Sequence, residues 1–170
     1  MSEEPSIVDR PAIPYVAITA NVTMDDLGAV VPPLTAEVLD WLRTKGIAPV
    51  GAPFWRYVVI EMGGGLQVES GVAVAEPIEG DARVHAGVLP AGRYASVLHV
   101  GHPQTLREAT ARLLEWGSAR GLSWDASPTP DGERWGCRLE IYHSDPGQDM
   151  DEWQTELAFR LAEEGFTYAV

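Results

Sequence analysis

One stretch of the sequence combines an acidic side chain with aromatic rings at a spacing that suits ligand binding. From Arg134 to Tyr142 the residues alternate, so a strand would place Trp135, Cys137, Leu139 and Ile141 on one face and Arg138, Glu140 and Tyr142 on the other. The second face then carries the Glu140 carboxylate beside the Tyr142 ring. An aromatic cation needs stacking surface together with negative charge, and this pair offers both. The alternative is a solvated face on which Glu140 pairs with Arg138 or Arg134, because charged strand residues are usually exposed.

Other aromatic and acidic residues could complete such a site. Trp55 and Trp135 fall on corresponding hairpins of two similar halves, where flat rings could enclose a planar ligand. Core packing is the competing interpretation for Trp135, because the alternation places it opposite Glu140. Tyr57 and Glu61 share a face with Trp55, with an ordinary exposed strand as their alternative.

Composition limits the classes of function. The chain has 170 residues, 45% hydrophobic and 22% charged, which is typical of one soluble domain. A net charge of −13 disfavours binding to nucleic acid. A single cysteine, Cys137, excludes an intrachain disulfide and a cysteine zinc cluster. No two of the four histidines have HxH or HxxxH spacing, so neither a metal site nor another cofactor is expected.

Targeting signals are also missing from the sequence. The first residues lack a basic segment followed by an apolar run, and no apolar stretch approaches the ~20 residues of a membrane helix. We therefore expect a cytoplasmic protein that does not associate with membranes.

The order of predicted elements repeats. Residues 1–13 are polar and proline-rich, which predicts a flexible arm. The periodicity then predicts strand 15–22, a helix from about 34 to 45, strands 52–62 and 66–76, strands 84–89 and 93–100, a helix from 103 to 120, and strands 134–143 and 154–162. The last segment also fits a helix, because Trp153, Leu157 and Leu161 are spaced by four. Residues 125–132 read as a loop.

The two predicted helices end alike. The segment Trp41–Ile47 matches Trp116–Leu122 at a shift of 75 residues, with a tryptophan, a basic residue, a glycine and an aliphatic residue in the same order. We therefore predict an α+β domain over residues 14–170. It contains two pseudo-symmetric β-α-β-β repeats, at about 14–76 and 84–162, which form an antiparallel sheet with two helices on one face. A ligand cleft is expected between the repeats.

The second half resembles a known family. The resemblance rests on Gly92-Arg93-Tyr94-Ala95, His99-Val100-Gly101, a helix ending at Trp116, Leu139-Glu140-Ile141-Tyr142 with Asp145-Pro146, and Trp153-Gln154-Thr155-Glu156-Leu157. Together these segments are similar to the GyrI-like small-molecule-binding domain, which is also the effector-binding domain of multidrug-sensing transcription regulators. The resemblance spans roughly residues 14–162.

The resemblance implies a fold of two β-α-β-β units and lipophilic aromatic cations as ligands, held around one acidic residue. That acid falls on Glu140, Tyr142 matches the aromatic residue two places later, and Trp153 lies in a matched segment and could line the cleft. The family often has Gly-Pro-Tyr where this chain has Gly101-His102-Pro103, so one aromatic residue of the pattern is missing. No helix-turn-helix precedes residue 14, so we expect a stand-alone effector domain and not a DNA-binding regulator.

Three functions are compatible with these features. The first is binding or sequestration of planar, lipophilic, cationic molecules, with Glu140 as counter-charge. The second is hydrolysis of electrophilic cyclopropane-type natural products, as in some relatives, with Glu140 as general base and Tyr142 orienting the water. The third is a module that holds a peptide in the cleft. The oligomeric state is left open.

Overall fold

The strands form one curled antiparallel sheet. The structure is a computed structural model that describes residues 4–61, 63–145 and 147–162. The strands of this part are β1 (Ser6–Arg10), β2 (Ile13–Thr23), β3 (Phe54–Ile60), β4 (Gly65–Ala73), β5 (His85–Leu89), β6 (Gly92–Val100), β7 (Ala126–Thr129), β8 (Gly132–Trp135), β9 (Arg138–Tyr142) and β10 (Gln154–Arg160). Across the sheet the order is β1-β6-β10-β9-β3-β4-β2-β5, while β8 pairs with β3 and β7 pairs with β8.

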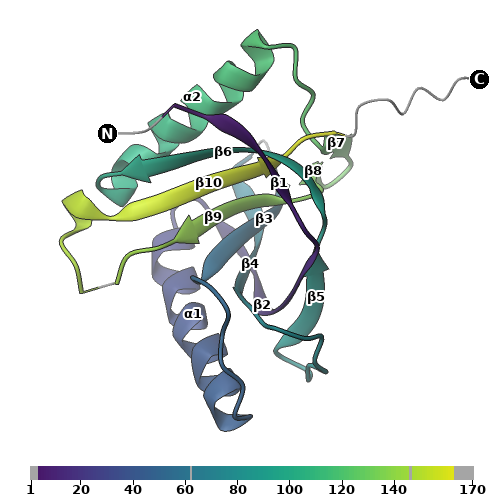
Figure 1. Ribbon diagram of the computed structural model, residues 1–170, viewed down its shortest axis with the longest axis vertical. Coiled ribbons are helices and arrows are strands. Elements are labelled where there is room, and N and C mark those ends of the chain that lie inside the picture. Colours follow the sequence, from purple (N-terminus) through teal and green to yellow (C-terminus); the bar gives the residue numbers. More distant parts are fainter. Residues whose placement is uncertain (1–3, 62, 146, 163–170) are drawn as a thin grey trace, which may run out of the picture.

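The sheet order confirms the predicted pair of repeats (Figure 1). Repeat one contributes β3, β4 and β2 from the centre outward, and repeat two contributes β9, β10 and β6 in the matching order. The repeats meet where β3 pairs with β9, and in this pairing Trp55 lies directly opposite Glu140. Directly opposed residues share a face of the sheet, so these two side chains project to the same side.

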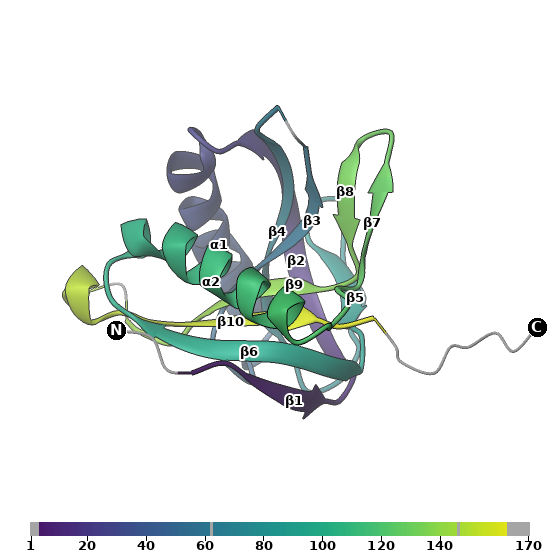
Figure 2. The same cartoon turned by 90° about the horizontal axis from the view of Figure 1, so that it is seen from above.

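Both helices lie on that same side of the sheet (Figure 2). Helix α1 (Leu27–Thr44) buries Val31, Val38 and Leu42, which are spaced at seven and four residues and pack against β2 and β4. Helix α2 (Leu106–Ala119) buries Leu106, Ala109 and Leu113 against β6 and β10. Strands β9 and β3 are left between the two helices, and we call their helix-side face the central strip. No helix in the described part of the chain is both long and apolar enough to cross a bilayer.

Helix α1 begins earlier than the sequence predicted. It starts at Leu27, and Pro32 and Pro33 lie inside it. A proline removes the hydrogen bond to the carbonyl four residues before it. Here those carbonyls belong to Gly28 and Ala29, which are exposed, so water can replace the missing donors. The two prolines therefore do not stop the helix.

The predicted strand 134–143 is two strands instead of one. Strand β8 ends at Trp135 and β9 starts at Arg138, with Gly136 and Cys137 between them. Residues 126–129, expected in a loop, form β7 and pair with β8. The last segment is a strand, as favoured, and its helical alternative is wrong.

The N-terminal arm differs from the expectation of a flexible segment. Of the expected arm 1–13, residues 6–10 form strand β1, which pairs with β6 along the edge of the sheet. Arg10 forms an ion pair with Glu156 on β10 and lies over the Tyr94 ring. Backbone pairing and one ion pair thus hold a segment whose polar sequence gave no strand signal.

Two helical glycines provide a test of the packing around α2. A Cβ added at Gly117 would lie 2.4 Å from the Trp124 ring, whereas nothing lies within 4 Å of the same position at Gly28 in α1. We expect Gly117→Ala to lower the free energy of unfolding by about 1–3 kcal/mol, because overpacking exceeds the helix-propensity gain of about 1 kcal/mol. Gly28→Ala should leave stability unchanged or raised. Urea unfolding gives the free energy of unfolding of both variants. Equal changes in the two would contradict the close packing of Gly117 against Trp124.

Candidate functional site

Glu140 lies at the centre of a polar and aromatic group on the central strip. The Tyr57 hydroxyl donates a hydrogen bond of 3.0 Å to Glu140 Oε1, and the Tyr142 hydroxyl donates to the same oxygen. The Trp55 ring meets the Tyr142 ring edge-on, with centroids 5.0 Å apart and planes at 65°. These residues and Arg138 are called the Glu140 group. Sequence analysis had proposed Glu140, Tyr57, Tyr142 and Trp55 as site residues, and the structure brings the four together.

The Glu140 carboxylate has neutral hydrogen-bond donors but no cation against it. Among the residues that the structure describes, no Lys, Arg or His nitrogen lies within 4 Å of Glu140, and none hydrogen-bonds to Oε2. Burial raises the pKa of Glu140 above its usual value of 4.5, and the Tyr142 and Tyr57 hydrogen bonds and the Arg138 charge only partly oppose this. The side chain is half-buried, so part of it is still reachable.

The two tyrosines act as neutral donors. Burial raises the pKa of Tyr57 and of Tyr142 well above 10, and the Glu140 charge raises both further. Each hydroxyl therefore keeps its proton at neutral pH and donates it to the carboxylate. This arrangement orients Glu140 without cancelling its charge.

The Arg138 guanidinium contacts aromatic rings and forms no ion pair with a carboxylate of the described residues. Its guanidinium carbon lies 4.6 Å from the Phe159 ring centroid, 4.8 Å from that of Trp135 and 6.0 Å from that of Tyr57. These are cation–π distances. Burial lowers the Arg138 pKa, and the Glu140 charge partly compensates. Sequence analysis considered Arg138 only as a partner of Glu140, and the structure shows no ion pair within 4 Å between these described residues.

Helix α1 supports the Trp55 side of the group. Thr35 Oγ1 on α1 lies 2.7 Å from Ser70 Oγ on β4 and accepts a weak bond of 3.4 Å from Trp55 Nε1. This link fixes the indole edge against the helix. Its spacing in sequence, from 35 to 55 to 70, gives no local signal, so sequence reasoning missed it.

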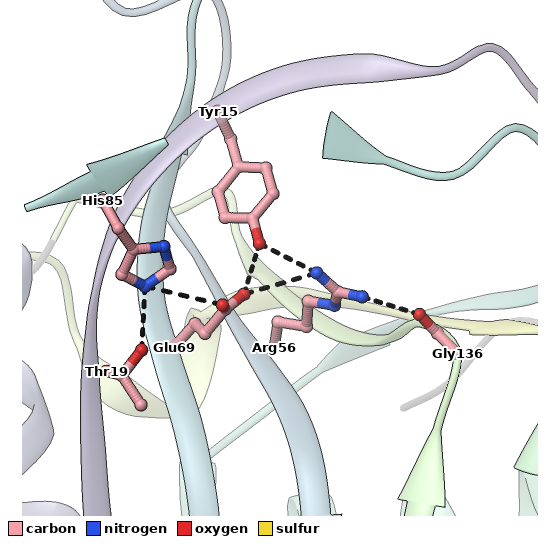
Figure 3. Close-up of polar contacts among 6 residues, drawn as sticks. All are labelled: Tyr15, Thr19, Arg56, Glu69, His85 and Gly136. Atoms are coloured by element: carbon pink, nitrogen blue, oxygen red, sulfur yellow. Dashed lines mark hydrogen bonds and ion pairs between the residues drawn. The ribbon is translucent and has the colours of Figure 1, made fainter. Parts of the chain in front are cut away.

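A second buried carboxylate lies on the opposite face of the sheet and is fully paired (Figure 3). Glu69 accepts a hydrogen bond of 2.5 Å from the Tyr15 hydroxyl, and the same oxygen lies 3.4 Å from Arg56 Nη1. His85 Nε2 lies 3.5 Å from its other oxygen. A carboxylate with these partners is a structural element. Glu140 differs from Glu69 in that no Lys, Arg or His nitrogen of the described residues lies within 4 Å of its carboxylate.

Arg56 also fixes the break between β8 and β9. Its Nη2 donates a hydrogen bond of 2.7 Å to the Gly136 carbonyl (Figure 3). A Cβ at Gly136 would lie 1.7 Å from an Asp125 carboxylate oxygen, so any larger residue would displace the Asp125 side chain. The break also shifts the register, because β3 pairs Arg56 with Leu139 but Val59 with Arg134. The Arg56–Gly136 hydrogen bond joins residues 80 positions apart, and the sequence could not reveal it.

The break corrects the predicted position of Trp135. The alternation placed Trp135 opposite Glu140, but its ring packs with Phe159 and Trp124 in the α2 core, on the helix side of the sheet. Trp135 is only 3% exposed, so core packing is its main role. It adjoins the Glu140 group through Arg138, whose guanidinium lies on its ring.

Two other residues proposed from the sequence, Glu61 and Trp153, lie outside the Glu140 group. Glu61 is exposed next to the end of β3, where its backbone closes the β3–β4 hairpin with Gly65. Trp153 lies directly before β10 and donates its indole N–H to the Gln148 carbonyl at 2.9 Å, while its own carbonyl accepts from Gly101. The structure shows neither side chain in contact with the four described residues that surround Glu140, and their role in binding stays a prediction.

A groove of about 760 Å³ runs along α2, away from Glu140. Its lining includes Val97 and His99 on β6, Arg112 and Trp116 on α2, and Pro5. None of the Glu140 group lines it. Apart from Pro5 of the N-terminal arm, its lining comes from repeat two and none comes from repeat one, so it is not the cleft that the sequence predicted between the repeats. Among the described residues, no three His, Cys, Asp or Glu side chains are arranged to hold a metal ion.

The raised pKa of Glu140 predicts a pH-dependent stability effect. Protonation of Glu140 is easier in the folded chain than in the unfolded one, so its contribution favours folding at low pH and is lost as pH rises through the folded-state pKa. We therefore expect Glu140→Gln to unfold at higher urea concentration than the wild type at pH 7, with the difference narrowing toward pH 4. The exposed Glu61→Gln control should stay within about 0.5 kcal/mol at both pH values. If Glu140→Gln were less stable than the wild type at pH 7, burial of the Glu140 charge would not be destabilising, and the prediction would be wrong.

Solved structures with the same fold come from regulators, binding proteins and enzymes. The C-terminal domain of EcmrR is 20% identical with a TM-score of 0.72, over 94% of this chain and 98% of that domain. In the EcmrR–DNA complex, this chain spans 57% of the EcmrR chain. SAV2435, solved bound to tetraphenylphosphonium, is 10% identical with a TM-score of 0.62, over 98% of this chain and 99% of its own. A hydrolase from Listeria innocua is 15% identical with a TM-score of 0.61, over 94% of this chain and 92% of its own.

A family comparison agrees with the fold and with the predicted resemblance. No curated protein sequence matches the chain. The family model of the GyrI-like small molecule binding domain matches residues 3–162, which include both repeats and the whole Glu140 group. The chain therefore belongs to the GyrI-like family of small-molecule-binding domains.

Proposed function

We propose that this protein binds or sequesters planar, lipophilic, cationic molecules on the central strip, with Glu140 as their counter-charge. The observation that carries the proposal is the state of the Glu140 carboxylate. Its Oε1 is oriented by two hydroxyls, its Oε2 has no partner among the described residues, and no cation lies within 4 Å. A charge that is costly to bury and is left without a counter-ion favours an incoming cation.

The rings beside Glu140 supply the second part of the recognition. Trp55 and Tyr142 are half-buried and lie against each other next to the carboxylate. A cation over such a ring gains roughly 0.5–1 kcal/mol at an exposed site and about 2 kcal/mol when desolvated. Stacking and a single charge require little directional fit, so the site should accept many aromatic cations. SAV2435, which shares the fold, is bound to tetraphenylphosphonium, a lipophilic aromatic cation.

Charge-dependent binding tests this function. We expect Glu140→Gln to weaken tetraphenylphosphonium binding by about 1–3 kcal/mol, the scale of a lost charged contact, and to change binding of the neutral triphenylmethanol far less. Titration with tryptophan fluorescence or calorimetry measures both dissociation constants. Glu115→Gln serves as a control, because this carboxylate is exposed on α2 and was not proposed as a site residue, and it should leave both unchanged. Equal losses for the cation and the neutral compound would refute Glu140 as the counter-charge.

A hydrolase is the second candidate, and one feature of the site favours it. A carboxylate with a raised pKa and two adjacent hydroxyls is suited to take a proton from water during attack on an electrophilic ligand. A Listeria innocua protein of the same fold is a hydrolase. Glu140 would be the base and Tyr142 or Tyr57 would orient the water.

Turnover separates the two candidates. With a cyclopropane-bearing electrophile, a hydrolase releases more than one equivalent of ring-opened product per protein, measured by mass spectrometry. Glu140→Gln should then lower the rate by about 10²–10⁴-fold, the usual contribution of a general base. If product formation stops at one equivalent per protein or below, and tetraphenylphosphonium binds reversibly, hydrolysis is excluded and the binding function is supported.

A further inference from the structure

Two charged groups of the Glu140 group lack partners, and they carry opposite signs. Glu140 Oε2 accepts no hydrogen bond from the described residues. The Arg138 guanidinium likewise donates none to a described residue and has no carboxylate within 4 Å, although it lies against three rings. Arginines elsewhere on the sheet are paired, as Arg56 is with Glu69 and Arg160 with Asp125. Arg138 is half-buried like these two arginines, but among the described residues it has no carboxylate partner.

The two groups point to the same side at a fixed separation. Arg138 and Glu140 are two residues apart on β9, which places both on the helix-side face at about 7 Å along the strand. Rings flank them on both sides, with Trp135 and Phe159 beside Arg138 and Trp55 beside the Tyr142 that bonds Glu140. Both charged side chains are half-buried, so a molecule on the central strip could touch both.

The rings satisfy Arg138 only in part. Cation–π contacts stabilise the charge of a guanidinium but leave its five N–H donors without acceptors. The planar fork of these donors matches a carboxylate in a bidentate geometry, and such charge-assisted pairs are about twice as strong as neutral hydrogen bonds. The lowered pKa of Arg138, caused by burial, agrees with a cation that is still short of counter-charge.

We propose that Arg138 is a specificity-determining residue that binds a carboxylate of the ligand, while Glu140 binds the ligand's cationic group. The preferred ligand is then a zwitterionic aromatic molecule that carries both a cationic group and a carboxylate. This inference rests on the proposed binding function and narrows its ligand class. A purely structural Arg138 would fill the space between the rings and would not distinguish ligands by an anionic group.

A matched pair of dyes tests the inference. Rhodamine 110 carries a free carboxylate beside its cationic ring system, and rhodamine 123 is its methyl ester. We expect the wild-type protein to bind rhodamine 110 about tenfold more tightly, because a charge-assisted pair replaces a neutral contact. This preference would oppose the general attraction of a chain with net charge −13 for the more cationic ester. Fluorescence polarisation gives both dissociation constants.

Variants assign the preference to Arg138. Arg138→Met keeps an apolar chain between the rings but removes the donors, and it should abolish the preference for rhodamine 110 while leaving rhodamine 123 bound as well or better. Arg138→Lys keeps the charge without the fork and should retain only part of the preference. Arg134→Met removes an exposed arginine on β8 and should change neither constant.

The possible outcomes separate this inference from the proposed function. Equal wild-type binding of the two dyes, or an unchanged ratio in Arg138→Met, would overturn the role of Arg138 even if both dyes bind. Rhodamine 123 binding that is insensitive to Glu140→Gln, or no binding of either dye, would instead overturn the proposed function and the inference with it. If Arg138→Met does not fold, the ratio of the two dissociation constants in the wild type and in Arg138→Lys still tests the role of Arg138.

Discussion

The structure depends on one constraint, a carboxylate that is held without a counter-ion at the junction of the two repeats. We call this junction, where β3 pairs with β9, the seam. Burying a charge is unfavourable unless it is paired, and Glu140 receives only two neutral hydroxyl donors. Glu69, on the other face of the same sheet, has a guanidinium and a tyrosine hydroxyl on one oxygen and a histidine near the other. The fold can therefore neutralise a buried acid, and it does not do so at Glu140. A destabilising charge at one place is typical of a site that gives up stability for binding.

The seam is short, and polar contacts cross it on both faces. Residues 54–56 of β3 pair with residues 139–141 of β9. On the helix side Tyr57 reaches Glu140, and on the other side Arg56 reaches the Gly136 carbonyl. Residues from one repeat thus position the acid of the other. The helices cover the strands on either side, α1 over β2 and β4 and α2 over β6, which leaves the seam as the sheet surface between them.

Local patterns predicted most of the elements and four of the five residues that form the Glu140 group, and long-range contacts decided the rest. The alternation around Glu140 placed the acid and Tyr142 on one face correctly, because residues 138–142 form an unbroken strand. The same alternation failed at Trp135, because the break at Gly136 depends on contacts outside the strand, with Arg56 80 positions away and with Asp125. Strand β1 was missed for a related reason, since pairing with β6 and the Arg10–Glu156 ion pair hold it, and no apolar pattern does.

Surface charge and site charge act on a cation at different ranges. A chain with net charge −13 attracts any cation, and this attraction is screened beyond about 8–10 Å at physiological salt. The field of Glu140 acts among packed rings, where water and ions are largely excluded, so salt reduces it much less. Salt-sensitive binding therefore reports the acidic surface, and the salt-resistant part reports the carboxylate. Arg138 lies on the same strip, so the site presents one charge of each sign even though the molecule is strongly acidic. If the proposed site binds aromatic cations, its selectivity should depend on how the ligand's own charges match these two groups, and not on the ligand's total charge.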